Sequence, residues 1–226
     1  NVYEEVAYVA AQIHRLVSQE GLRYREIALI GRKTEGYTAP LAELFPQYGI
    51  PYFLDRREDI LSTPLVNGLL AALEAVRLGF ETERILRLCK SGLLDLEEQQ
   101  VAALENYCYI WSVQGKKWTV PFRDNPQGLA ETMTEEDQAQ LQALEQTRRQ
   151  VVEPLERLRG ALQEGTGSAF ATALYEYLVQ LDAPKALTQL AHGDKQTLED
   201  FSQVWESVMG LLDTFDETVG PRHFPL

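Results

Sequence analysis

Two pairs of basic residues in this 226-residue chain each follow a short apolar run, and their side chains could bind phosphate. The pairs are Arg32 with Lys33 and Arg56 with Arg57. If both runs are neighbouring parallel strands, their carboxyl ends meet at one sheet edge, which is where open α/β sheets bind ligands. The four side chains would then form a basic rim for the phosphates of DNA or of a nucleotide. The alternative is local pairing of Arg56 and Arg57 with the acidic residues beside them, whose charges cancel theirs.

A second candidate site combines two cations with an aromatic ring. Lys116 and Lys117 precede Trp118 in a loop, and they form the only basic cluster in an acidic part of the chain. Proteins that bind single-stranded nucleic acid place basic side chains along the backbone and stack aromatic rings on the bases. This pattern makes the three residues a candidate DNA contact. The alternative is that Trp118 anchors the loop into its own helical core.

Catalytic constellations are missing from the sequence. No phosphate-loop, nucleophile-elbow or zinc-protease motif occurs, and His14, His192 and His223 are far apart. The acidic groups Glu97–Glu98 and Glu135–Asp137 have the ligand chemistry of a metal site. Both groups lie in the expected first turn of a helix, however, where the helix dipole favours carboxylates. We therefore predict no catalytic residue and no metal site in this chain.

The elements that would position the basic rim form a strand-helix-strand unit. Ile27–Ile30 and Ile50–Leu54 are short apolar runs typical of buried strands, and helical spacing runs from Tyr37 to Phe45 between them. The unit has the length of a parallel crossover. Together with helices over 3–17 and 64–78, it predicts a partial parallel-sheet α/β domain over residues 1–79.

The rest of the chain, residues 80–226, has no strand pattern and is predicted to be all helical. The expected caps are Thr82, Asp95 with Glu98, Thr134 and Ser168. With apolar spacing and breakers, they place helices at about 82–90, 95–113, 134–162, 168–181, 183–190 and 197–215.

Charge is distributed unevenly between these two parts. The chain has 21 basic and 34 acidic side chains, and residues 91–226 hold 10 and 22 of them. An acidic surface repels phosphate, so a broad nucleic-acid footprint on this part is disfavoured. No apolar run reaches the length of a membrane span and no signal peptide is visible, so we expect a cytoplasmic protein. Cys89 and Cys108 lack metal-site spacing and are expected to be core thiols.

The order of segments resembles a known family of DNA enzymes. The chain is similar to the second motor domain of superfamily 1 helicases, and more closely to AddB, the B subunit of bacterial ATP-dependent helicase-nucleases. The segments that carry the resemblance are Glu20–Ile30, Tyr48–Arg57, Thr63–Leu65, Leu86–Leu94, Leu104–Tyr107 and Gly115–Trp118.

This resemblance implies a 2A-like domain over residues 1–79 and a helical 2B-like domain over residues 80–226. It implies a parent protein that unwinds and degrades DNA with ATP during double-strand break repair by recombination, together with an A subunit. ATP, magnesium and an iron-sulfur cluster are implied for the parent only, outside this chain. Arg32 takes the position of a motif that reaches nucleotide phosphates in related motors, although Gly31 replaces the expected aromatic residue.

Two further expectations complete the sequence-based interpretation. The ends of the chain suggest a piece of a longer protein, so uncovered strand edges should promote self-association. The competing hypothesis is a helical protein-protein interaction module without nucleic-acid function. It explains the acidic helical part, but it gives no reason for basic residues after both apolar runs.

Overall fold

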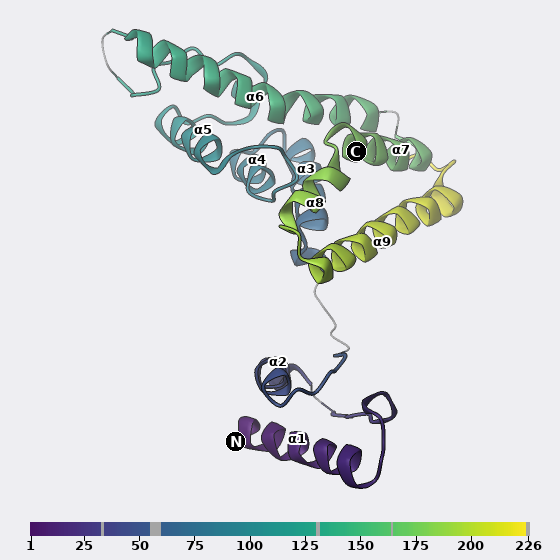
Figure 1. Ribbon diagram of the computed structural model, residues 1–226. Helices are drawn as coiled ribbons and strands as arrows, with labels where there is room; N and C mark the ends of the chain where they lie inside the picture. Colours follow the sequence, from purple (N-terminus) through teal and green to yellow (C-terminus); the bar gives the residue numbers. More distant parts are fainter. Residues whose placement is uncertain (33, 55–59, 130–131, 164, 225–226) are drawn as a thin grey trace. The chain divides into compact units, whose positions relative to one another are not determined.

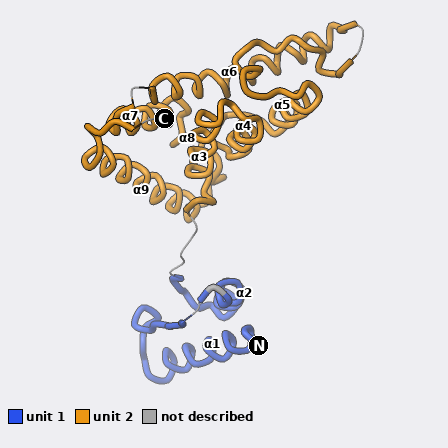
Figure 2. The backbone as a smooth tube through the Cα atoms, turned by 180° about the vertical axis from the view of Figure 1, so that it is seen from behind, with its two compact units in different colours: residues 1–58 blue, residues 59–226 orange. Residues whose placement is uncertain are grey.

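The computed structural model describes residues 1–32, 34–54, 60–129, 132–163 and 165–224. The chain forms two compact units, Asn1–Glu58 and Asp59–Leu226 (Figure 2). The boundary expected after residue 79 falls inside the second unit, because the helices on either side of Gly79 pack against each other. Each unit has its own hydrophobic core.

The predicted partial parallel sheet is wrong for the described residues. Neither Ile27–Ile30 nor Ile50–Leu54 is a strand, and no ladder of backbone hydrogen bonds joins them. Ile27 ends a 3-10 turn with extended backbone angles, and Ile50 is tied to the end of a helix by its amide. Both segments have extended-chain composition, but a strand exists only where a partner accepts its hydrogen bonds.

Helices α1 (Val2–Gln19) and α2 (Thr38–Gln47) make up most of the first unit. Asn1 and Glu4 form a capping box that starts α1, so its first amides are satisfied. The two helices share an apolar core, and Tyr37 donates a 2.5 Å hydrogen bond to Glu5 across them. The core side chains are Val6, Ala10, Ile13, Leu41, Phe45 and Ile50. Two 3-10 turns complete the unit, at Tyr24–Glu26 and Glu35–Tyr37.

The second unit is built from helices (Figure 1). Two 3-10 segments, Ile60–Ser62 and Gly115–Thr119, accompany them. The helices in chain order are α3 (Pro64–Arg77), α4 (Thr82–Cys89), α5 (Glu98–Ile110), α6 (Glu135–Leu162), α7 (Gly167–Gln180), α8 (Ala183–Leu190) and α9 (Lys195–Val219). The long α6 packs against α3, α5 and α7, and α9 packs chiefly against α7.

Local capping explains where these helices begin. The box predicted at Thr134 is confirmed, because its hydroxyl accepts from the Asp137 amide while the Asp137 carboxylate accepts from the Thr134 amide. Three other predicted caps were misplaced. Helix α4 is preceded by Glu81, α5 starts at a capping box of Glu97 with Gln100, and α7 is capped by Thr166.

Helices α7 and α9 meet at a backbone contact that requires glycine. A Cβ atom on Gly167 would lie 2.4 Å from the carbonyl oxygen of Val219. The amides of Gly167 and Ser168 donate to the carbonyls of Arg222 and Gly220, each at 3.0 Å. The start of α7 is therefore fixed to the end of α9 by main-chain hydrogen bonds.

Cys89 on α4 and Cys108 on α5 are free, buried thiols, as predicted from the sequence. Burial raises the pKa of each thiol to about 12, since a thiolate would lose its hydration there. Among the described residues, no helix combines the length and apolarity needed to span a bilayer.

Candidate nucleic-acid interface

The basic turn of the second unit lies in the 3-10 segment Gly115–Thr119, directly after α5. Lys116 and Lys117 are both exposed. The Lys117 ammonium donates to the carbonyl oxygens of Trp111 and Ser112, at 2.9 and 3.1 Å. These carbonyls belong to the C-cap residue of α5 and to the residue after it, so the Lys117 cation lies at the negative end of the helix dipole. The Lys116 ammonium makes no hydrogen bond or ion pair with any residue that the structure describes, so Lys116 is the cation of this turn that is available to a ligand.

Trp118 is completely buried beneath this turn. Its indole Nε1 donates to the Thr82 hydroxyl at 2.9 Å, and that hydroxyl donates in turn to the carbonyl of Val113. The Thr82 amide donates to the Gln114 side chain at 3.0 Å, and the Gly115 amide donates to a carbonyl before α4 at 3.1 Å. The structure thus places Trp118 in the helical core, where its ring holds the turn against the start of α4.

An ion pair on α6, between the buried Arg148 and the partly buried Glu145, fixes the other side of the turn. The Arg148 guanidinium donates to the Trp118 carbonyl at 2.6 Å and to the Glu145 carboxylate at 2.7 Å through both Nε and Nη2. Glu145 also accepts from the Phe122 amide at 3.0 Å and from Arg149 at 2.9 Å. The Arg148 charge lies 5.7 Å from the centre of the Phe122 ring. The segment that follows the lysines is therefore anchored to α6 at two points.

These contacts lower the pKa of the Glu145 carboxyl. Burial alone would raise it, but hydrogen bonds from Arg148, the Phe122 amide and Arg149 outweigh burial and hold it at about 2, against 4.5 for a free carboxyl. A carboxyl group whose pKa is lower in the folded than in the unfolded state stabilises the fold at pH values above its unfolded pKa. That stabilisation is lost as pH falls through the folded pKa.

We expect the free energy of unfolding to fall between about pH 4.5 and pH 2 because Glu145 takes up a proton on unfolding in that window. Urea titrations at several pH values, read by the signal of the second unit, give the slope. Glu145→Gln should make the slope shallower, whereas the matched change Glu176→Gln, at an exposed position on α7, should leave it unchanged. Equal slopes for the parent and Glu145→Gln would contradict the assignment.

In the first unit, Arg32 is exposed after the segment Ile27–Ile30. The other three members of the predicted basic rim, Lys33, Arg56 and Arg57, lie outside the described residues. The basic rim and its role therefore stay a prediction.

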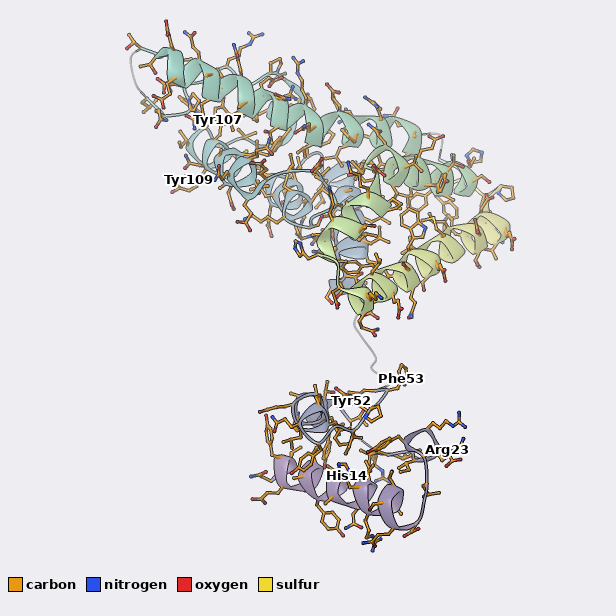
Figure 3. The ribbon with its side chains drawn as sticks, viewed as in Figure 1. His14, Arg23, Tyr52, Phe53, Tyr107 and Tyr109 are labelled. Atoms are coloured by element: carbon orange, nitrogen blue, oxygen red, sulfur yellow. The ribbon has the colours of Figure 1, made fainter. Side chains whose placement is uncertain are left out.

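Large apolar side chains of the first unit face solvent beside these positions. Ile30 is 90% exposed and Phe53 is 92% exposed. Figure 3 shows Phe53 projecting away from α1 and α2. The sequence pattern predicts both residues inside a sheet, so their exposure follows from the missing strands.

The Arg148–Glu145 ion pair beside the basic turn was not recognised from the sequence, although a signal for it exists. Leu144, Arg148, Val151 and Leu155 recur at helical spacing, so an arginine occupies a position on the core-facing stripe of α6. A charge on such a stripe must be paired when buried. Glu145, three residues earlier, is the partner that this spacing allows.

The cysteines of this chain and the ligand groups of its described residues do not suit an iron-sulfur cluster or a bound metal ion. Iron-sulfur clusters are held by four cysteine thiolates, whereas this sequence has two cysteines, both protonated in the core. Among the described residues, no group of three or more His, Cys, Asp or Glu side chains could hold a metal ion.

Comparison with known proteins gives a consistent set of relatives. No family model matches the chain. It is 36% identical to the B subunit of the ATP-dependent helicase/deoxyribonuclease of Geobacillus kaustophilus over 98% of its length. It is 33% identical to the B subunit of the same name from Bacillus anthracis over 100% of its length, and 34% identical to that of Anoxybacillus flavithermus over 98%. The chain spans 21% of the length of each of these relatives. Over nearly all its residues, this chain is therefore homologous to a segment of the ATP-dependent helicase/deoxyribonuclease B subunits, the AddB family.

Proposed function

We propose that this chain is a DNA-handling, non-catalytic segment of an ATP-dependent helicase/deoxyribonuclease subunit that acts in double-strand break repair by recombination. The observation that carries the proposal is the 33–36% identity to B subunits over nearly the whole chain. In this proposal the parent is a cytoplasmic enzyme, and it works with an A subunit. ATP and magnesium bind to parts of the parent outside this chain.

The acidic groups and the missing motifs support the non-catalytic part of the proposal. Asp137 is a helix-capping residue, and Glu97 forms the capping box of α5. Such carboxylates are used in starting helices, not in binding a reactive group. The sequence has no phosphate loop, which a nucleotide-hydrolysing motor needs to hold the phosphates of ATP.

DNA contact is proposed through the anchored turn and the exposed Arg32. The hydrogen bonds around Trp118 and Arg148 hold the turn in one conformation, so Lys116 can meet a phosphate at little cost in loop ordering. The net charge of −13 opposes DNA elsewhere on the chain. Contacts are therefore few, and binding by the chain alone is weak.

The proposal is tested by titrating a fluorescein-labelled single-stranded oligonucleotide with the full chain while following anisotropy. We expect weak, salt-sensitive binding and neither ATP hydrolysis nor DNA cleavage. Lys116→Ala should reduce the slope of log affinity against log salt by about 1, as expected for one lost phosphate contact. The matched change Lys185→Ala, at an exposed position on α8, should leave the slope unchanged. Tight, salt-insensitive binding or measurable turnover would refute the proposal.

A protein-interaction module remains the second candidate function, and two surfaces favour it. The first consists of two exposed apolar side chains of the first unit, Ile30 and Phe53, which support the proposal that the chain self-associates. The second is an apolar groove between α8 and α9 in the other unit.

A further inference from the structure

The groove between α8 and α9 is an open depression of about 280 Å³. Its lining includes Leu187 from α8 and the α9 side chains Leu198, Phe201, Trp205 and Glu206. The two helices follow one another in the chain and contact each other in the second unit (Figure 1). A depression of this size, with an apolar floor, has room for one or two large side chains of a partner.

Most of the apolar face of α9 is only partly covered by the rest of the second unit. Of its 25 residues, only Val208 and Leu212 are buried. Phe201 and Trp205 are half-buried, and Leu198 is 39% exposed. Amphipathic helices are stabilised by burying their apolar face, so further burial at the groove would be favourable.

An acidic ridge runs along α9 beside the groove. Glu199, Glu206, Asp213 and Glu217 are spaced by 7, 7 and 4 residues, which places them along one side of the helix. All four are exposed, and Glu206 also lines the groove. No ion pair joins them to any residue that the structure describes. At 1.5 Å per residue the ridge is about 27 Å long.

The two helices that form the groove, with their connecting loop, carry few cations that could neutralise this ridge. Residues 183–219 contain two lysines and seven carboxylates. Such a surface repels nucleic-acid phosphates and attracts cationic side chains. An apolar floor with a long acidic edge is complementary to one kind of partner, which has large apolar residues on one face and lysines or arginines beside them.

We propose that the α8–α9 groove binds an amphipathic basic helix of a protein partner. The apolar side chains of that helix enter between Leu187 and Trp205, and its cations lie along the ridge that includes Glu206. A helix of about 18 residues matches the ridge in length. This docking site develops the protein-interaction candidate, and it does not depend on DNA binding by the basic turn, which lies on other elements.

The probe for this site is a synthetic 18-residue helix with leucines on one face and lysines along the adjoining edge. A peptide of identical composition in scrambled order, which has no amphipathic face, serves as its control. Binding to the full chain is measured by anisotropy at low and high salt, and hydrogen exchange locates the protected amides. We expect the ordered peptide to bind at least about tenfold more tightly than the scrambled one, with protection confined to α8 and α9.

Variants of the chain distinguish binding at this groove from non-specific attraction of a basic peptide to an acidic protein. Glu199→Lys combined with Glu206→Lys should weaken binding about tenfold or more and reduce its salt dependence, while Glu176→Lys on α7 should change affinity less than about twofold. Leu198→Gln should also weaken binding about tenfold. Leu211→Gln is the matched apolar control, because Leu211 is 66% exposed on α9 and does not line the groove.

The outcomes are distinct from those of the DNA experiment, which depends on Lys116. Equal binding of ordered and scrambled peptides, or equal effects of Glu176→Lys and the double reversal, would show a non-specific charge effect and overturn the proposal. Loss of the probe site through dimer formation, detected by sedimentation velocity, would assign the groove to a second copy of this chain and would also overturn it.

Discussion

Replacement of Trp118 by alanine is expected to lower the free energy of unfolding of the second unit by about 3–5 kcal/mol. The side chain is completely buried and contacts the Phe122 ring at a centroid distance of 5.9 Å. Its removal leaves a cavity beside Phe122 and the start of α4, and it deprives the Thr82 hydroxyl of its 2.9 Å donor. Urea denaturation followed by circular dichroism gives the change in free energy.

Two controls distinguish this anchor from an aromatic ring on the surface. Trp118→Phe keeps much of the volume and loses the indole donor, so it should cost less than Trp118→Ala. Tyr109→Ala removes an aromatic ring that is 85% exposed on α5, and Figure 3 shows this ring on the outside of the unit. It should change stability by no more than about 0.5 kcal/mol. A loss below about 1 kcal/mol for Trp118→Ala would contradict the anchor.

Replacement of Arg148 by alanine is expected to cost about 2–4 kcal/mol, because it removes a buried guanidinium and its charge-assisted hydrogen bonds to Glu145 and to the Trp118 carbonyl. The change leaves the Glu145 carboxylate without its main donor and the Trp118 carbonyl without its 2.6 Å hydrogen bond. The turn that carries Lys116 and Lys117 loses one of its two anchors. Chemical denaturation measures the cost, and proteolysis between α5 and α6 should become faster.

Arg149→Ala is the matched control, since Arg149 donates to the same carboxylate but is 59% exposed. Exposed ion pairs contribute little, so this change should cost no more than about 1 kcal/mol. Glu145→Gln should be less harmful in an Arg148→Met background than in the parent, because the carboxylate has then already lost its main donor. Additive effects of the two changes would show that the pair is not energetically coupled.

The helices could be predicted from sequence because each carries its own signal. Apolar spacing marks the face that packs, and the Thr134–Asp137 box starts α6 through contacts three residues apart. Caps were misplaced where a side chain makes a distant contact instead. Thr82 is an example, because its hydroxyl donates to the Val113 carbonyl and accepts from the Trp118 indole, so it does not cap the first turn of α4.

The sheet was predicted wrongly because strand pairing is not a local property. The apolar run Ile27–Ile30 has the composition of a buried strand, but composition does not supply a neighbouring strand. The candidate site shows the same limit. The lysines of the loop could be picked out from the sequence. The hydrogen bond from Arg148 to the Trp118 carbonyl, which holds this loop, joins residues 30 positions apart and has no local signal.

The buried thiols provide a chemical measure of how often the second unit opens. The chain has two cysteines, Cys89 and Cys108, and the first unit has none. Only the thiolate attacks a disulfide reagent, and burial suppresses both access and ionisation. A thiol reagent can therefore react with these cysteines only after α4 or α5 has transiently separated from the core. When reclosing is fast, the labelling rate reports the free energy of that opening, unaffected by events in the first unit.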